Sequence, residues 1–266
     1  MSDPLVAALL GQSSAALAED VSLATPVTAP RISGRGSVSA ALRAYGDALG
    51  GPEATARLKG DEIEGVVYSS GADDGATQIV ALAQFDPAGL ISTVDVYGRP
   101  WPYIGRLMER MAKTAPELAD PSLGNRPYVP DKSRTVSIGH PAIPPLAADV
   151  TLYSPILSGE PSGKPVVERI LEAAAQSYSD LEVRAVLNVE GQAAFAIVID
   201  EIVHGHVLEL VEIFTLNAAG EVSEVRVFSR PWLVTAHFRK RMHALLKDIL
   251  GPELWQGPDP QGPVPV

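Results

Sequence analysis

An internal repeat constrains the fold more than any other feature of this sequence. The segment GLISTVDVYGRPW at residues 89–101 returns as GEVSEVRVFSRPW at residues 220–232, with seven of thirteen positions identical. Upstream, DVSLATP at residues 20–26 returns as DVTLYSP at residues 149–155, with four identities in seven. The copies lie 129 residues apart at the front of the unit and 131 at the back. Self-similarity at a nearly constant offset is typical of a repeated structural unit, so we expect two similar folded units in tandem.

Composition indicates a globular protein and excludes several kinds of partner. The chain has 266 residues, 46% of them hydrophobic, so each unit is long enough to bury a core. The net charge of −11 opposes binding to nucleic acid or to an anionic membrane surface. The absence of cysteine excludes disulfides and thiolate chemistry. No signal peptide and no apolar run of ~18 residues is apparent, so we expect a cytoplasmic protein that does not enter a membrane.

Proline marks the boundaries that we expect between the units. Residues 116–147 contain seven prolines, and proline can neither continue a helix nor donate a hydrogen bond in a sheet. We therefore predict a first domain over residues 1–115, a linker over 116–147, a second domain over 148–254 and a disordered tail over 255–266.

Within each unit the hydrophobic pattern predicts a short strand, a helix, a run of strands and a closing helix. In the second unit the expected helices span residues 164–178 and 233–250, and the expected strands span 150–153, 181–189, 193–202, 207–216 and 222–229. In the first unit a strand over 21–24 and a helix over 36–49 hold the matching positions. Helices combined with meandering, mostly antiparallel strands predict an α+β fold.

This pattern resembles the nuclear transport factor 2 superfamily, and within it the SnoaL-like bacterial members. The second unit carries the resemblance in Asp149-Val150 with Pro155, Gly163 before the helix, residues 179–181, the turn at 217–220 and RVFSRP at 226–231. The first unit shows a weaker set in Asp20-Val21, Pro26, Gly34, residues 86–89 and DVYGRP at 95–100. The resemblance implies two tandem cone-shaped, cystatin-like domains, each a curved antiparallel sheet wrapped on helices around an apolar pocket. Because many members pair through their sheets, a tandem copy resembles a dimer fused into one chain.

The superfamily includes polyketide cyclases, steroid isomerases, epoxide hydrolases, dehydratases and proteins without catalysis, so the fold alone does not select a reaction. Strand alternation then ranks the residues that line a pocket. In the last strand, Arg226, Phe228 and Arg230 share a face. The resemblance implies that this face points into the cone. On the preceding strand the same argument turns Glu212 inward, which would make Glu212 and Arg226 cross-strand neighbours.

Two interpretations of Glu212 and Arg226 follow. Glu212 is a candidate general base, with Arg226 as the electrostatic partner that holds it ionised or polarises a substrate oxygen. Alternatively the two form a buried ion pair that only fixes the strand register. The pattern of two aspartates flanking an arginine, known from limonene epoxide hydrolases, occurs in neither unit.

In the first unit Ala81 matches Glu212, and Asp95, Tyr97 and Arg99 match Arg226, Phe228 and Arg230. Asp95 with Tyr97 resembles the carboxylate and phenol of a steroid isomerase site, although here both lie on one strand. The alternative is an exposed aspartate beside a core tyrosine.

Three further features complete the candidate site. His204 and His206 flank Gly205, which indicates a hairpin tip as readily as a metal site, so we expect no metal and place His204 at the pocket rim. Tyr153, at the end of the early strand, joins the candidate substrate contacts. In the repeated Arg-Pro-Trp, proline ends the strand and Trp packs the next helix, while Arg99 and Arg230 are candidates for binding an anionic group.

The first functional hypothesis is a cofactor-free isomerase, cyclase, dehydratase or hydrolase that acts on a hydrophobic small molecule by carboxylate-mediated proton transfer. Its candidate catalytic residues are Glu212, Arg226, Asp95 and Tyr97, and its substrate contacts are Arg230, His204, Phe228, Tyr153 and Arg99. The alternative is a non-catalytic protein that binds a small ligand or serves as an interaction scaffold. In either case we expect an internal pseudo-dimer, either monomeric or further paired as a homodimer.

Overall fold

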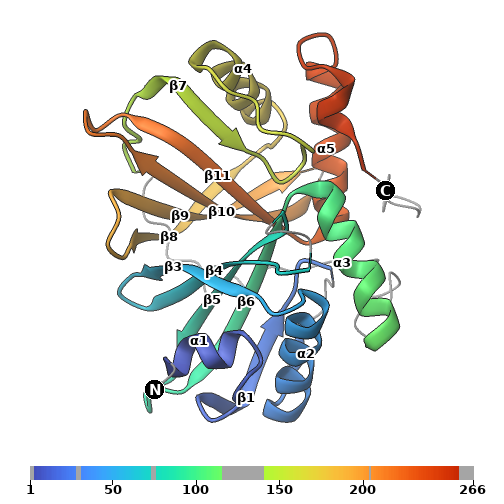
Figure 1. Cartoon of the computed structure of the whole chain (residues 1–266). Coiled ribbons are helices and arrows are strands. Elements are labelled where there is room, and N and C mark those ends of the chain that lie inside the picture. Colours follow the sequence, from blue (N-terminus) through green and yellow to red (C-terminus); the bar gives the residue numbers. More distant parts are fainter. Residues whose placement is uncertain (1–2, 28–30, 73–75, 116–140, 204, 258–266) are drawn as a thin grey trace.

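The computed structural model describes the whole chain except residues 1–2, 28–30, 73–75, 116–140, 204 and 258–266 (Figure 1). Eleven strands form one sheet, in the order β2-β1-β6-β5-β4-β3-β8-β9-β10-β11-β7. The strands of the N-terminal half (residues 3–115) and of the C-terminal half (residues 141–257) therefore occupy separate ends of this order. Helices pack against the sheet in both halves, so the predicted α+β class with a mostly antiparallel sheet is confirmed.

The two halves repeat the same order of elements. The N-terminal half comprises α1 (Pro4–Leu9), β1 (Leu17–Ala24), β2 (Ile32–Ser33), α2 (Arg35–Ala48), β3 (Glu53–Lys59), β4 (Ile63–Ser69), β5 (Gln78–Phe85), β6 (Ile91–Arg99) and α3 (Trp101–Thr114). The C-terminal half comprises β7 (Leu146–Tyr153), α4 (Lys164–Ala175), β8 (Leu181–Val189), β9 (Ala194–Val203), β10 (His206–Leu216), β11 (Val222–Arg230), α5 (Trp232–Leu246) and a 3₁₀ turn (Pro252–Trp255). The expected elements of both halves are present, with ends that shift by a few residues.

Equivalent positions in the two halves make equivalent contacts. The first strand of each half pairs in parallel with the last one, through Leu23 and Val94 in one half and Leu152 and Val225 in the other. Before each following helix a glycine has a positive φ, 91° at Gly34 and 89° at Gly163, and donates its N–H to the first strand at 2.8 Å. A side chain is strained at such a φ, which explains glycine at both positions.

The two halves meet along the faces of the sheet that lie away from their helices, and we call this interface the junction. β3 pairs with β8 on one side of it, and β6 meets β11 at Gly98 and Ser229 on the other, so eight strands close into a ring. Apolar side chains fill the space between the two faces: Leu58, Ile63, Val67, Val80, Leu82, Tyr97, Leu187, Val189, Ala196, Val198, Val211, Ile213 and Phe228. Two other cores lie on the helical faces, one in each half.

Some predicted boundaries are wrong. β7 begins at Leu146, inside the predicted linker, most of which lies outside the described residues. α5 ends at Leu246 rather than residue 250. The first residues of the predicted tail are packed, because the buried Arg239 guanidinium donates to the backbone carbonyls of Trp255 and Gln256. Among the described residues, no helix is long and apolar enough to cross a membrane.

Candidate functional site

The register of β10 and β11 separates the two residues that the sequence places together. Glu212 lies opposite Val227, and Arg226 lies opposite Ile213. Residues directly opposite share a face of the sheet, so Glu212 faces the helices while Arg226 faces the other half. The prediction that Glu212 and Arg226 are neighbours in the cone is therefore wrong. A shift of one residue in the assumed register moves every side chain of a strand to the opposite face.

The other candidates on β6 and β11 also face the junction between the halves. Phe228 and Tyr97 belong to the apolar layer there, and Asp95 and Arg230 are buried beside it. The expectation that Phe228 and Arg230 line the cone is thus wrong, and so is the alternative of an exposed Asp95. Tyr97 is the core tyrosine of that alternative.

At one end of this junction the buried charges are paired, partly within the C-terminal half and partly across the two halves. Arg230 contacts Asp95 at 3.1 Å and Glu209 at 3.3 Å. Arg184 contacts Glu209 and Asp200 at 3.4 Å each, and the Tyr97 hydroxyl donates to Glu209 at 3.4 Å. Charges buried this deeply are tolerated because each has an opposite partner.

The titration of this cluster reflects its burial. Burial and the charges of Glu209 and Asp95 raise the pKa of Tyr97 well above its usual value, so the phenol stays protonated. Burial also raises the pKa of Asp200 to about 7, against the opposing effect of Arg184. Asp95, Arg230, Glu209, Arg184 and Asp200 are each paired with an opposite charge, so the geometry favours a structural role for this cluster.

Arg99, Arg226 and Tyr153 meet at the opposite end of the junction. Both guanidinium groups lie against the Tyr153 ring, 5.1 Å and 5.2 Å from its centroid. Arg99 donates to the side-chain oxygen of Gln78 at 2.6 Å, and Arg226 pairs with Glu224 at 2.5 Å. Three residues that the sequence assigns to a substrate site are therefore together, but outside either cone.

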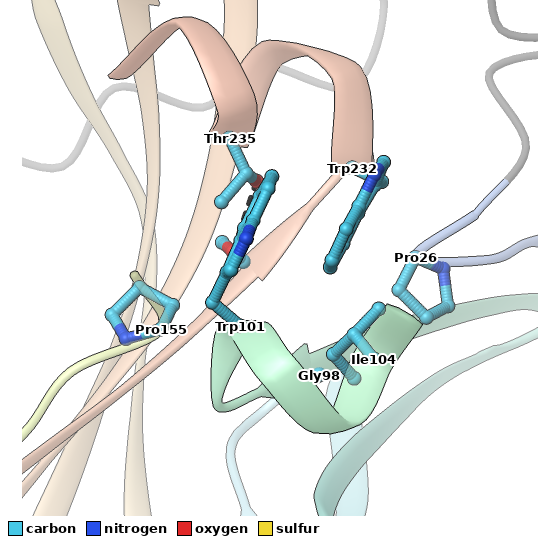
Figure 2. A pocket seen from close by; sticks show the side chains of 8 residues that line it. Pro26, Gly98, Trp101, Ile104, Pro155, Trp232 and Thr235 are labelled. Carbon is cyan, nitrogen blue, oxygen red and sulfur yellow. Dashed lines mark hydrogen bonds between the residues drawn. The ribbon is translucent and has the colours of Figure 1, made fainter. Parts of the chain in front are cut away.

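The tryptophans of the repeated motif border a small pocket beside Gly98 and Ser229, where β6 meets β11 (Figure 2). Trp101 and Trp232 stack with their centroids 3.7 Å apart, and each follows a cis Arg-Pro bond. The lining residues are Pro26, Gly98, Trp101, Ile104, Pro155, Ser229, Trp232 and Thr235. Instead of packing only their own helices, as the sequence predicts, the two rings join the halves.

The helical face of the second half holds a different group of ionisable side chains. Glu201 on β9 is 5% exposed, and its Oε2 atom has no hydrogen-bond partner. Glu201 lies opposite Leu208, and Glu212 lies opposite Ile197, so both carboxyls face the same apolar core. The apolar pair Ile199 and Leu210 separates them along the strands.

The pKa values of these two carboxyls are both raised, but to different extents. Burial raises the pKa of Glu212 to about 7. Burial, followed by the charge of Glu212, raises the pKa of Glu201 to about 9. Tyr178 follows the end of α4. Burial and the charges of Glu201 and Glu212 raise the pKa of Tyr178. Two carboxyls with separated pKa values can act as an acid and a base at neutral pH.

The first half lacks this group. The offset of the repeat places Ser70 at the position of Glu201, Ala81 at that of Glu212 and Leu49 at that of Tyr178. Ser70 donates to the Leu49 carbonyl at 2.8 Å, and Ala81 lies in the apolar core. Only the second half thus has carboxyls at these positions.

Of the acid–base group, the sequence identifies only Glu212. Glu201 follows a long apolar run, and a charged residue at that place is a signal that could have identified it. No sequence pattern singles out Tyr178. His204 lies outside the described residues. The His206 ring lies 5.9 Å from that of His237 on α5. Among the described residues no group of three His, Asp or Glu side chains is placed to hold a metal ion.

Comparison with known proteins gives structural matches only. No family model and no curated protein matches the sequence. A cystatin-like protein from Silicibacter pomeroyi is 25% identical with a TM-score of 0.37, and covers 39% of this chain and 72% of its own. A steroid delta-isomerase from Pseudomonas aeruginosa is 20% identical with a TM-score of 0.37, covering 39% and 75%. A SnoaL-like family protein from Agrobacterium tumefaciens is 15% identical with a TM-score of 0.27, covering 32% and 74%.

Proposed function

We propose that this chain is a duplicated protein of the nuclear transport factor 2-like, SnoaL-like kind, whose C-terminal half is a cofactor-free enzyme. Its substrate is a hydrophobic small molecule with an acidic C–H bond beside a carbonyl group, and the reaction is a proton transfer such as isomerisation. The observation that carries this proposal is the placement of Glu201 and Glu212 on one apolar face, with an unpartnered Glu201 oxygen. A structural carboxylate is normally paired, whereas a catalytic one is kept ready for substrate.

The two carboxyls have distinct roles in this proposal. Glu212, with a pKa of about 7, is ionised in a large fraction of molecules at neutral pH and accepts the substrate proton. Glu201, with a pKa of about 9, is protonated and donates a hydrogen bond to the oxygen on which negative charge develops. Tyr178 lies near both and is a second donor.

The surroundings favour an apolar substrate. Ile199 and Leu210 lie between the carboxyls, and each carboxyl is two residues from one of them, a step of about 7 Å along a strand. The charge of Glu212 acts on Glu201, so in this proposal both carboxyls reach a ketone that lies over Ile199 and Leu210, Glu201 at its oxygen and Glu212 at the adjacent C–H. The N-terminal half, with Ser70 and Ala81 at these positions, is then a scaffold.

The test is proton exchange, because exchange does not require knowledge of the product. The protein is incubated in D₂O with a panel of apolar mono- and bicyclic ketones, and loss of the protons beside the carbonyl is followed by ¹H NMR. We expect catalysed exchange for at least one ketone. Glu212→Gln should lower its rate by about 10²- to 10⁴-fold, the usual contribution of a general base. Glu201→Gln should lower the rate while retaining substrate binding.

Glu190→Gln is the matched control, because Glu190 is exposed in the turn after β8. This variant should exchange at the wild-type rate. Equal rates in the Glu212→Gln and Glu190→Gln variants would remove Glu212 from the mechanism. If the ketones bind the folded wild type but none of them exchanges, the non-catalytic binding protein becomes the better account.

A further inference from the structure

We propose that Arg99, Arg226 and Tyr153 form a second binding site, at the junction of the two halves, for a small organic carboxylate. This site lies on the face of the sheet opposite Glu201 and Glu212, so it is independent of the acid–base group in the cone. Its central feature is a buried guanidinium that the protein itself does not neutralise.

Arg99 is 4% exposed, which for a charged side chain requires an opposite charge or an equivalent set of hydrogen bonds. Within the described part of the chain, Arg99 makes no ion pair, and its side-chain partner is the neutral amide of Gln78. Its Nε atom is buried without a hydrogen-bond partner. Among the described residues, the site therefore holds a buried guanidinium with no paired carboxylate and with at least one unused donor.

The repeat shows what is missing. Arg230 holds the position of Arg99 in the second half, and it is neutralised by Asp95 and Glu209. At the matching positions around Arg99, Arg226 replaces Asp95 and Gln78 replaces Glu209. One end of the junction has two carboxylates at these positions. The matching positions at the other end hold an arginine and an amide. An external carboxylate would restore the charge pairing that Arg230 has within the chain.

The second arginine, Arg226, adds positive charge to the site and is partly exposed to solvent. Arg226 is 33% exposed in its side chain, so solvent reaches this end of the junction. Its Nε atom also lacks a hydrogen-bond partner, although another of its nitrogens contacts Glu224. Burial and the charge of Arg226 lower the pKa of Arg99 to about 10, against the opposing effect of the exposed Glu160. The acidic groups nearby thus compensate Arg99 only in part.

The chemistry of the site favours a carboxylate attached to an apolar body. A guanidinium presents parallel N–H donors that match the two oxygens of a carboxylate. The Tyr153 ring, which is partly exposed and contacts both guanidinium groups, offers a surface on which an aromatic or alicyclic group can stack. Inorganic phosphate shares the charge but has no apolar part.

The experiment uses benzoate as the probe, with acetate and inorganic phosphate as comparisons at constant ionic strength. Binding is followed through the arginine Nε–H signals of ¹⁵N-labelled protein. We expect benzoate to shift the Arg99 and Arg226 signals and to bind more tightly than acetate or phosphate. Arg226→Gln and Arg99→Gln should weaken benzoate binding at least tenfold, whereas Arg43→Gln, a change of an exposed arginine on α2, should leave it unchanged.

Three results would overturn the proposal. Equal benzoate affinity in the Arg99→Gln and Arg43→Gln variants would place the anion elsewhere. Tighter binding of phosphate than benzoate would exclude an organic carboxylate as the ligand. Shifts of exposed arginines alone would indicate non-specific binding. Because Arg226 is partly exposed, Arg226→Gln keeps the test decisive even if Arg99→Gln does not fold.

Discussion

The indole rings of Trp101 and Trp232 stack face to face across the two halves, with centroids 3.7 Å apart and planes 7° from parallel. Both rings are almost completely buried, and each begins the helix that follows a repeated Arg-Pro pair. Equivalent residues of the two halves are thus brought into direct contact (Figure 2). Because this contact joins the halves, it has measurable consequences for their cooperativity.

Replacing either tryptophan should destabilise the whole chain. Trp101→Ala or Trp232→Ala should each lower the free energy of unfolding by about 3–5 kcal/mol, the usual cost of truncating a buried tryptophan. The double variant should cost about 1 kcal/mol less than the sum, because the stacking is lost only once. Urea unfolding of the four proteins measures this coupling. Strict additivity would show that the stack contributes nothing beyond burial.

Removing Asp95 should be more costly than removing an exposed acid. Asp95 contacts Arg31 at 2.7 Å and Arg230 at 3.1 Å, so Asp95→Asn removes one of the two carboxylates that pair with the fully buried Arg230. We expect a loss of about 3–5 kcal/mol in the free energy of unfolding. Asp61→Asn, in the exposed turn between β3 and β4, is the control and should change little. A loss below about 1 kcal/mol for Asp95→Asn would contradict a structural role for the cluster.

The two equivalent arginines should respond oppositely to replacement by methionine. Arg99→Met removes a buried charge that has no ion pair, so in a buffer without organic anions it should raise Tm. Arg230→Met leaves Asp95 and Glu209 buried without this partner and should lower Tm. Differential scanning calorimetry compares the two directly. A lower Tm in both variants would mean that Arg99 is already compensated within the protein.

The raised pKa of Glu201 predicts a specific pH dependence of stability. The pKa is about 9 in the folded protein and near 4.5 in the unfolded chain, so between these values the folded state holds a proton that the unfolded state lacks. Stability contributed by this group is therefore complete below about pH 4.5 and is lost as pH rises toward 9. Glu201→Gln should remove this loss and be more stable than wild type at pH 8, by on the order of a few kcal/mol.

Glu212→Gln should show the same effect over a narrower range, because its pKa is about 7. The measurement is urea unfolding of wild type and both variants at pH 5, 6.5 and 8. Parallel pH profiles for wild type and Glu201→Gln would show that Glu201 is already ionised in the folded protein.

Much of the fold follows from the sequence because its signals are local. Strand alternation, proline positions and the glycines before the helices predict the elements of the second half to within a few residues, and the repeat predicts the same order in the first. The offset of the repeat also identifies equivalent positions, such as Arg99 and Arg230, without any structure. A core position for Tyr97 is one of the two alternatives that the sequence leaves open.

The site was predicted less well, because it depends on pairing between segments. Nothing within residues 206–230 states whether Glu212 lies opposite Val227 or opposite a neighbour, and that single step decides which face each side chain takes. Glu209 meets Tyr97, and Arg230 meets Asp95, because the two halves pack against each other.

The α+β class, the order of the elements and the difference between the halves at the positions of Glu212 and Asp95 can be deduced from the sequence. Hydrophobic periodicity and the identity between the two copies are properties of the chain that do not depend on folding. The structure was needed to show that Arg226, Phe228 and Arg230 face the other half, that Glu201 joins Glu212, and that Arg99 is buried with no paired carboxylate among the described residues. Burial and charge pairing depend on register and on docking between distant segments, and these are set by the packing of the whole molecule.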